Sequence, residues 1–141
     1  MNDILEFCFN TNTWSVVQVD QCSPSPCPRS GHSAVFYNDC MYVFGGKDDD
    51  SEKLNDLWQF NFLTSTWKKI ETGQPDEEIP LPRSGHSSSI YRDYMVVFGG
   101  IHEITKELND LFLFSFAQNK WIVLERDTIS PMKAHSQYSP G

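Results

Sequence analysis

The feature that most constrains the fold is an internal repeat with a period of 54 residues. The segment PRSGHS occurs at 28–33 and again at 82–87, and VFGG follows each copy, at 43–46 and at 97–100. The same spacing of 54 separates His32 from His86 and Trp67 from Trp121. One register therefore holds across a whole unit, which predicts an array of similar structural units.

The repeat also extends beyond the two complete copies. Toward the N-terminus, NDILEF at 2–7 matches NDLWQF at 55–60, and toward the C-terminus PMKAHS at 131–136 is a degenerate PRSGHS. We therefore divide the chain into a partial unit, two complete units and the start of a further unit. The expected boundaries are 1–20 for the partial unit, 28–71 and 82–126 for the complete units, and 131–141 for the last one.

Within each unit the hydrophobic pattern is that of β-strands. LWQFNF places Trp58, Phe60 and Phe62 on one face and polar residues on the other, and LFLFSF and ILEFCF repeat this period of two. MYVFGG and MVVFGG are short apolar runs ended by glycines, as expected for a strand buried on both faces. GHSAVFY and TWKKI, with their counterparts GHSSSIY and KWIVLE, supply a first and a fourth strand. The sequence predicts an all-β protein with four short strands in each unit.

These motifs together resemble the kelch repeat: Arg-x-x-His at the first strand, a double glycine after the second, an aromatic third strand and a Trp seven residues beyond its Phe. The resemblance covers nearly the whole chain. It implies four-stranded antiparallel sheets that form the blades of a β-propeller, here about two and a half blades of an incomplete ring. Most kelch units carry Tyr-Asp in the third strand, where this chain has Phe60-Asn61. The long period resembles a subset that includes Rab9-effector, host-cell-factor and leucine-zipper-like kelch proteins.

The residues that recur in every unit have a structural interpretation. Paired glycines supply unusual backbone angles and let a neighbouring blade approach closely, and tryptophans are large enough to fill the space between facing sheets. The Arg-x-x-His pair recurs once per blade, as scaffold residues do, and we expect it to form hydrogen bonds between blades. The residues assigned to the scaffold are Gly45, Gly46, Gly99, Gly100, Trp14, Trp67, Trp121, His32 and His86.

Function is expected in the loops, which differ from blade to blade. The loops at 47–53 and 101–107 have equal length but different chemistry, and the kelch resemblance implies that they share a partner-binding face with the connections at 20–27 and 72–81. An arginine at the opening of a blade could also capture a carboxylate there. The candidate partner-binding residues are Arg29, Ser30, Asp48, Asp49, Asp50, Arg83, Ser84, His102 and Glu103.

Several classes of site do not fit the sequence. Asp48–Asp50 lack the spaced ligands and central glycine of an EF-hand, so we interpret them as a solvated loop. The four cysteines form no C-x-x-C pair, so we expect neither a metal site nor a cofactor. A net charge of −8 disfavours nucleic acid and anionic membranes as partners. With no signal peptide or apolar span, we expect a cytoplasmic protein, the nucleus being possible.

The sequence therefore predicts a protein–protein interaction module that acts as a scaffold or adaptor for another protein or peptide, and not an enzyme. Two alternatives remain open: a fragment of a galactose-oxidase-like, metal-dependent kelch enzyme with catalytic residues elsewhere, and a self-assembling structural protein. Two complete blades would leave apolar faces uncovered at both ends. We expect a piece of a longer chain whose remaining blades cover these faces, or else self-association through them.

Overall fold

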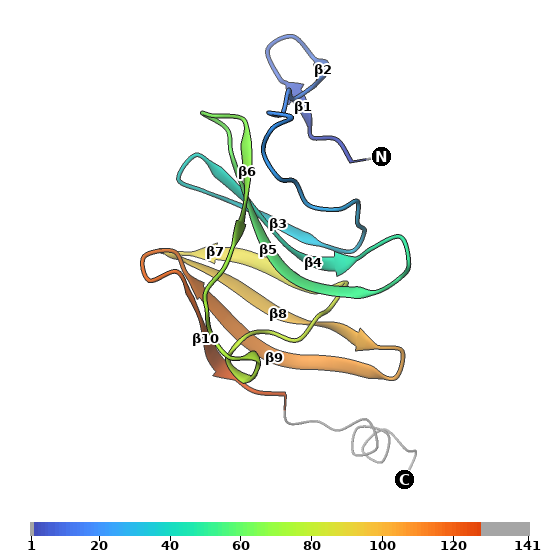
Figure 1. The fold of residues 1–141 in the computed structure, drawn as a ribbon, viewed down its shortest axis with the longest axis vertical. Coiled ribbons are helices and arrows are strands. Elements are labelled where there is room, and N and C mark those ends of the chain that lie inside the picture. The colour runs from blue at the N-terminus through green and yellow to red at the C-terminus, as the bar shows by residue number, and fades with distance from the viewer. Residues whose placement is uncertain (1, 128–141) are drawn as a thin grey trace.

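The computed structural model describes residues 2–127, which form ten strands in three antiparallel sheets (Figure 1). The first sheet is a hairpin of β1 (Leu5–Cys8) and β2 (Thr13–Val16). The second has the order β3 (Ser33–Tyr37), β4 (Cys40–Lys47), β5 (Lys53–Asn61) and β6 (Thr66–Ile70). The third has the order β7 (Ser87–Tyr91), β8 (Tyr94–Glu103), β9 (Lys106–Ser115) and β10 (Lys120–Glu125).

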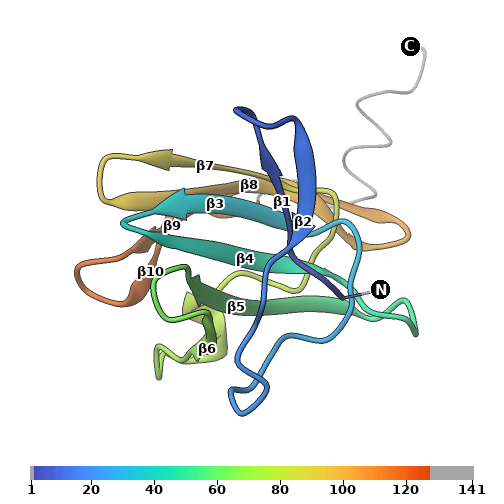
Figure 2. The ribbon, with the colours of Figure 1, turned by 90° about the horizontal axis from the view of Figure 1, so that it is seen from above.

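The predicted fold class is confirmed. Each four-stranded sheet is an antiparallel meander that follows chain order, and one short 3₁₀ turn, η1 (Asp76–Glu78), lies between the two sheets in sequence. The sheets stack face to face, as the blades of a propeller do (Figures 1 and 2). The further unit expected at 131–141 lies outside the described residues.

The predicted strand ends at the double glycines are wrong, because β4 and β8 run through them to Lys47 and Glu103. Gly45 and Gly46 have φ angles of +67° and +97°, and the pairing register shifts between Phe44 and Gly46, which is a β-bulge. A Cβ atom on Gly46 would lie 2.8 Å from the carbonyl oxygen of Ser30. Glycine is therefore needed both for the backbone angle and for the close approach.

The loop segments 47–53 and 101–107 have equal length, but their secondary structure differs. The turn between β4 and β5 spans 48–52, whereas β8 and β9 continue almost to each other and leave only Ile104 and Thr105 between them. The second loop is therefore a long, tight hairpin whose tip extends beyond the sheet.

The main core lies between the two four-stranded sheets. It is built from side chains on one face of each sheet, at alternating strand positions. A smaller core lies on the opposite face of the β3–β6 sheet, where Val43, Trp58, Phe60 and Trp67 contact residues flanking the β1–β2 hairpin. The buried members of the main core are Cys40, Tyr42, Phe44 and Leu57 from one sheet and Met95, Val97, Phe112, Phe114 and Trp121 from the other.

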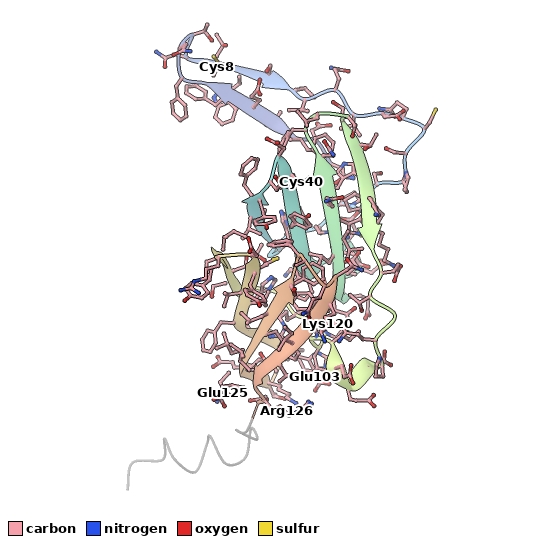
Figure 3. All side chains as sticks on the ribbon, turned by 90° about the vertical axis from the view of Figure 1, so that its left-hand side faces the viewer. Cys8, Cys40, Glu103, Lys120, Glu125 and Arg126 are labelled. Atoms are coloured by element: carbon pink, nitrogen blue, oxygen red, sulfur yellow. The ribbon has the colours of Figure 1, made fainter. Side chains whose placement is uncertain are left out.

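The three repeated tryptophans have different environments. Trp121 is 5% exposed, with its ring centroid 5.1 Å from that of Phe44 in the neighbouring sheet, and Trp67 is 9% exposed. Trp14 is 68% exposed, which corrects the expectation that it packs between blades. Trp67 and Trp121 pack toward the sheet that precedes theirs in the chain, and no sheet precedes the β1–β2 hairpin in the part of the chain that the structure describes. Figure 3 shows Cys8 at the far end of this hairpin, away from the larger sheets.

Candidate protein-interaction site

The candidate surface begins where each blade opens, at the segments before β3 and β7. The amide of Ser30 donates to the carbonyl of Lys47 (3.0 Å), and the amide of Lys47 donates back to Ser30 (2.8 Å). Ser84 and Ile101 exchange the equivalent pair of bonds at 3.0 and 2.8 Å. Each hairpin loop is therefore fastened to the opening of its own blade.

The two openings also lie side by side. The amide of Gly85 donates to the carbonyl of Gly31 (2.9 Å), and the amide of Gly46 donates to the carbonyl of Arg83 (2.8 Å). Figures 1 and 2 show the β4–β5 and β8–β9 hairpins on the same side of the molecule. The structure thus brings Ser30, Ser84 and the two loops onto one continuous surface.

The β4–β5 loop is acidic and ordered. One carboxylate oxygen of Asp48 accepts hydrogen bonds from the amides of Asp50 (2.9 Å) and Glu52 (3.0 Å), which closes the turn. Asp49 and Asp50 are exposed. The first aspartate therefore has a structural role, and the next two present their carboxylates to solvent.

The β8–β9 hairpin offers different chemistry. His102 is partly buried, with Nδ1 2.6 Å from the carbonyl oxygen of Pro82. Because a carbonyl oxygen only accepts, Nδ1 carries the proton and the imidazole anchors the hairpin to the blade opening. Glu103 is exposed, and Ile104 at the tip is 100% exposed. The two hairpins thus present exposed carboxylates and an exposed apolar side chain on the same side of the molecule.

The repeated arginines do not belong to this surface. Arg83 donates to both carboxylate oxygens of Asp110 (2.5 and 2.8 Å) and to the carbonyl of Gly99 (2.9 Å), and its side chain is 0% exposed. Arg29 holds Asp56 in the same way at 2.6 and 2.9 Å, with its side chain 4% exposed. Both guanidinium groups are thus held by a carboxylate of their own blade and are buried away from a partner. The expected bidentate capture of a carboxylate occurs, but inside a single blade.

Asp56 and Asp110 are the residues that sequence reasoning missed. Burial raises the pKa of Asp56, but hydrogen bonds from Arg29 and from the Trp58 indole outweigh it and hold that pKa below its usual value. The signal was the dipeptide Asn-Asp, which repeats with the same period as the arginine. A buried arginine that recurs in every unit requires a carboxylate that recurs with it.

Of the expected contacts between blades, His86 provides the clearest. Its Nε2 lies 2.7 Å from the hydroxyl of Ser33 in the neighbouring blade, its ring meets Phe44 edge-on at 5.3 Å, and Nδ1 is buried without a partner. Burial, together with the positive charge of Arg83, lowers the pKa of His86 to about 4. The equivalent His32 is more exposed than His86. Its pKa is also lowered, mainly because part of the ring is removed from water and to a smaller extent because of the positive charge of Arg29.

Two further observations concern residues 2–127 only. No three side chains of the types His, Cys, Asp or Glu gather there in an arrangement that could hold a metal ion. None of the described segments forms a helix long and apolar enough to span a membrane.

Comparison with known proteins gives a family match over almost the entire chain. The model of the KLHDC2/KLHL20/DRC7 Kelch-repeats domain matches residues 1–139. The Rho GTPase-activating protein gacHH of Dictyostelium discoideum is 37% identical over 129 residues, which cover 82% of this chain and 8% of that protein. The mouse leucine-zipper-like transcriptional regulator 1 is 40% identical over 120 residues (85% and 14%), and human host cell factor 2 is 40% identical over 93 residues (62% and 11%). The chain thus spans a small part of the relatives it matches.

Proposed function

The chain belongs to the kelch-repeat family, whose members generally serve as protein-interaction modules, and we propose that it binds a protein or peptide partner through the surface formed by its two hairpin loops. In this role the blades form the structural scaffold, and the loops determine the binding specificity. The observation that carries the proposal is the hydrogen-bonded joining of the two blade openings, which holds two loops of different chemistry on one face.

The chemistry of the surface indicates what the partner presents. Asp49 and Asp50 are exposed and suit a basic segment, whereas Ile104 suits an apolar contact beside it. The net charge of −8 also favours a positively charged partner. We therefore expect a partner segment that carries Lys or Arg next to an apolar side chain, and association that weakens with salt.

The test is affinity capture with the intact protein, followed by binding measurements with the purified partner at two salt concentrations. Asp49→Asn with Asp50→Asn removes two charges from the loop and leaves the Asp48 turn intact. Asp39→Asn with Glu6→Gln removes two charges elsewhere and is the matched control. We expect the loop variant to weaken binding by about three- to tenfold and to reduce its salt dependence. Equal binding by both variants, with His102→Ala also unaffected, would place the interaction elsewhere.

We also propose that further kelch units, in the same longer chain or in other copies, cover the open faces at the two ends. This is supported by the exposure of Trp14 (68%) at one end and of Phe98 (49%) at the other. Phe98 corresponds to Phe44, which is 0% exposed because the next blade covers it. Metal analysis of the full-length protein tests the enzymatic alternative, which stoichiometric copper or iron would favour.

A further inference from the structure

The outer edge of the second complete blade lies beneath the segment that connects β6 to β7. In the order β10-β9-β8-β7, β10 stands at one end, so one of its edges has no strand beside it among the described residues. Residues 71–78 of the connecting segment, which include η1, run along this edge (Figure 1). An open strand edge offers backbone donors and acceptors to another chain, so this covering controls access to the sheet.

The covering is held by hydrogen bonds along the whole strand. The side-chain amide of Gln74 accepts a bond from the amide of Trp121 (2.6 Å) and donates one to the carbonyl of the same residue (2.9 Å). A residue of a neighbouring antiparallel strand would make the same two bonds. At the two ends of β10, the side chains of Asn119 and Arg126 donate to carbonyls of the connecting segment (3.1 and 3.2 Å). Gln74 therefore takes the place of a strand residue.

The internal repeat shows that this covering is not common to all edge strands of the chain. In the first complete blade β6 is the outer strand, and Trp67 corresponds to Trp121. Counted from the tryptophan of its own unit, Gln21 occupies the position of Gln74. Gln21 instead donates to the carbonyl of Val19 (3.3 Å), and the backbone of Trp67 has no hydrogen-bond partner outside β5 within residues 2–127.

The two outer strands also differ in chemistry. The exposed residues Lys68 and Lys69 of β6 stand where β10 has Ile122 and Val123, and the next residue of β10, Leu124, is 50% exposed. Lysines on an edge strand oppose pairing with another chain, whereas apolar β-branched residues favour it. The edge of β6 is thus protected by its own charges, and the edge of β10 is protected by the connecting segment.

We propose that residues 71–78 form a displaceable cover, locked by Gln74, over a strand-accepting edge of β10, and that the occupant of the uncovered edge is β10 of a second copy. Antiparallel pairing of a strand with its own copy gives a closed, two-fold contact. Lys120 and Glu125 lie at opposite ends of β10 (Figure 3), so this pairing brings unlike charges together. Regular pairing ends at a β-bulge after Val123, and the contact is therefore short. It does not involve the hairpin loops, so the inference is independent of the proposed function.

The experiment compares variants of the full-length protein. Gln74→Ala removes the lock, and Gln21→Ala is the matched control, because it changes the same repeat position where no neighbouring strand is bonded. Ile122→Lys copies Lys68 of β6 and is made alone and together with Gln74→Ala. In a β10–β10 pair it places lysines of the two copies close to each other. The single Ile122→Lys variant gives the baseline for self-association through any other face.

The readouts are amide hydrogen exchange at Trp121, at a concentration where the protein is monomeric, and sedimentation over a range of concentrations. We expect Gln74→Ala to speed the exchange of this amide by about tenfold or more, and to strengthen self-association by about tenfold or more. Gln21→Ala should do neither, and Ile122→Lys should abolish the gain in self-association.

Two results would overturn the proposal. Unchanged exchange at Trp121 in Gln74→Ala would show that Gln74 does not hold the edge. Self-association that does not rise in Gln74→Ala, or that rises equally when Ile122→Lys is present, would show that the edge of β10 does not accept a second copy.

Discussion

Acidification should weaken the joint between the two complete blades through His86. This imidazole is 9% exposed, bonded to Ser33 and held neutral, with a pKa lowered to about 4 from an ordinary 6.5. The unfolded chain takes up the proton below pH 6.5, whereas the folded chain resists it until about pH 4, so stability is fully present above 6.5 and falls through that window. At about 1.4 kcal/mol per pKa unit, the total loss is about 3 kcal/mol, of which about 2 kcal/mol has occurred by pH 5.

The measurement is urea unfolding at matched protein concentration between pH 7.5 and pH 5, for the wild type, His86→Gln and His32→Gln. Carboxylates contribute to the pH dependence of the free energy of unfolding in all three proteins. The difference in this pH dependence between the wild type and each variant therefore reports the contribution of the replaced histidine. Glutamine can still bond Ser33 but does not titrate. We expect His86→Gln to lose about 2 kcal/mol less than the wild type over this range, and the His32→Gln slope to stay closer to that of the wild type. A His86→Gln slope equal to that of the wild type would refute the assignment of a buried neutral imidazole.

Two further predictions use the repeat as its own control. Asp110→Asn leaves the fully buried Arg83 without its counter-charge and should cost about 3–5 kcal/mol in urea unfolding. Asp56→Asn, at the more exposed copy of the ion pair, should cost less, and the reverse order would contradict the burial argument. Trp121→Ala should cost about 3–5 kcal/mol, whereas Trp14→Ala should stay within about 0.5 kcal/mol in a thermal or urea melt of the monomer. Equal losses would show that Trp14 is covered in solution.

The period of the sequence was sufficient to predict the blades. Alternation in LWQFNF identified the third strand, and turn residues such as Asn38 and Asp39 have the positive φ angles (50° and 64°) that tight hairpins require. These features depend on contacts within a blade, and every copy repeats them. The same local reasoning failed at the double glycines, where a bulge lets β4 continue, because bulge and strand end leave similar signals in the sequence.

The candidate site was less accessible to sequence reasoning. Arg29 and Arg83 stand at the openings of their blades, which is also where a partner-binding arginine would stand. Only the structure shows that the guanidinium groups donate hydrogen bonds to Asp56 and Asp110 of their own blades. Arg83 and Asp110 are separated by 27 residues within one unit. Every repeated residue has the same period of 54, so the period alone does not tell which repeated residues contact each other. The proposal of Asp48–Asp50 and His102 as partner-binding residues, by contrast, rests on the loops in which the two copies of the repeat differ.

The same residue type at the same repeat position has a different physical role according to its neighbours. His32 and His86 differ in exposure, and so do Trp14 and Trp121, although each pair has one place in the unit. The buried copies, His86 and Trp121, lie next to a complete four-stranded sheet, whereas His32 and Trp14 do not, and this is a property of the array and not of the unit. The repeat motif therefore predicts which side chains a blade packs against its neighbour, and the exposed copies mark the positions where the described residues provide no such neighbour. Exposed copies of residues that are buried elsewhere in the array are for this reason stronger indicators of a docking surface than exposed apolar residues in general.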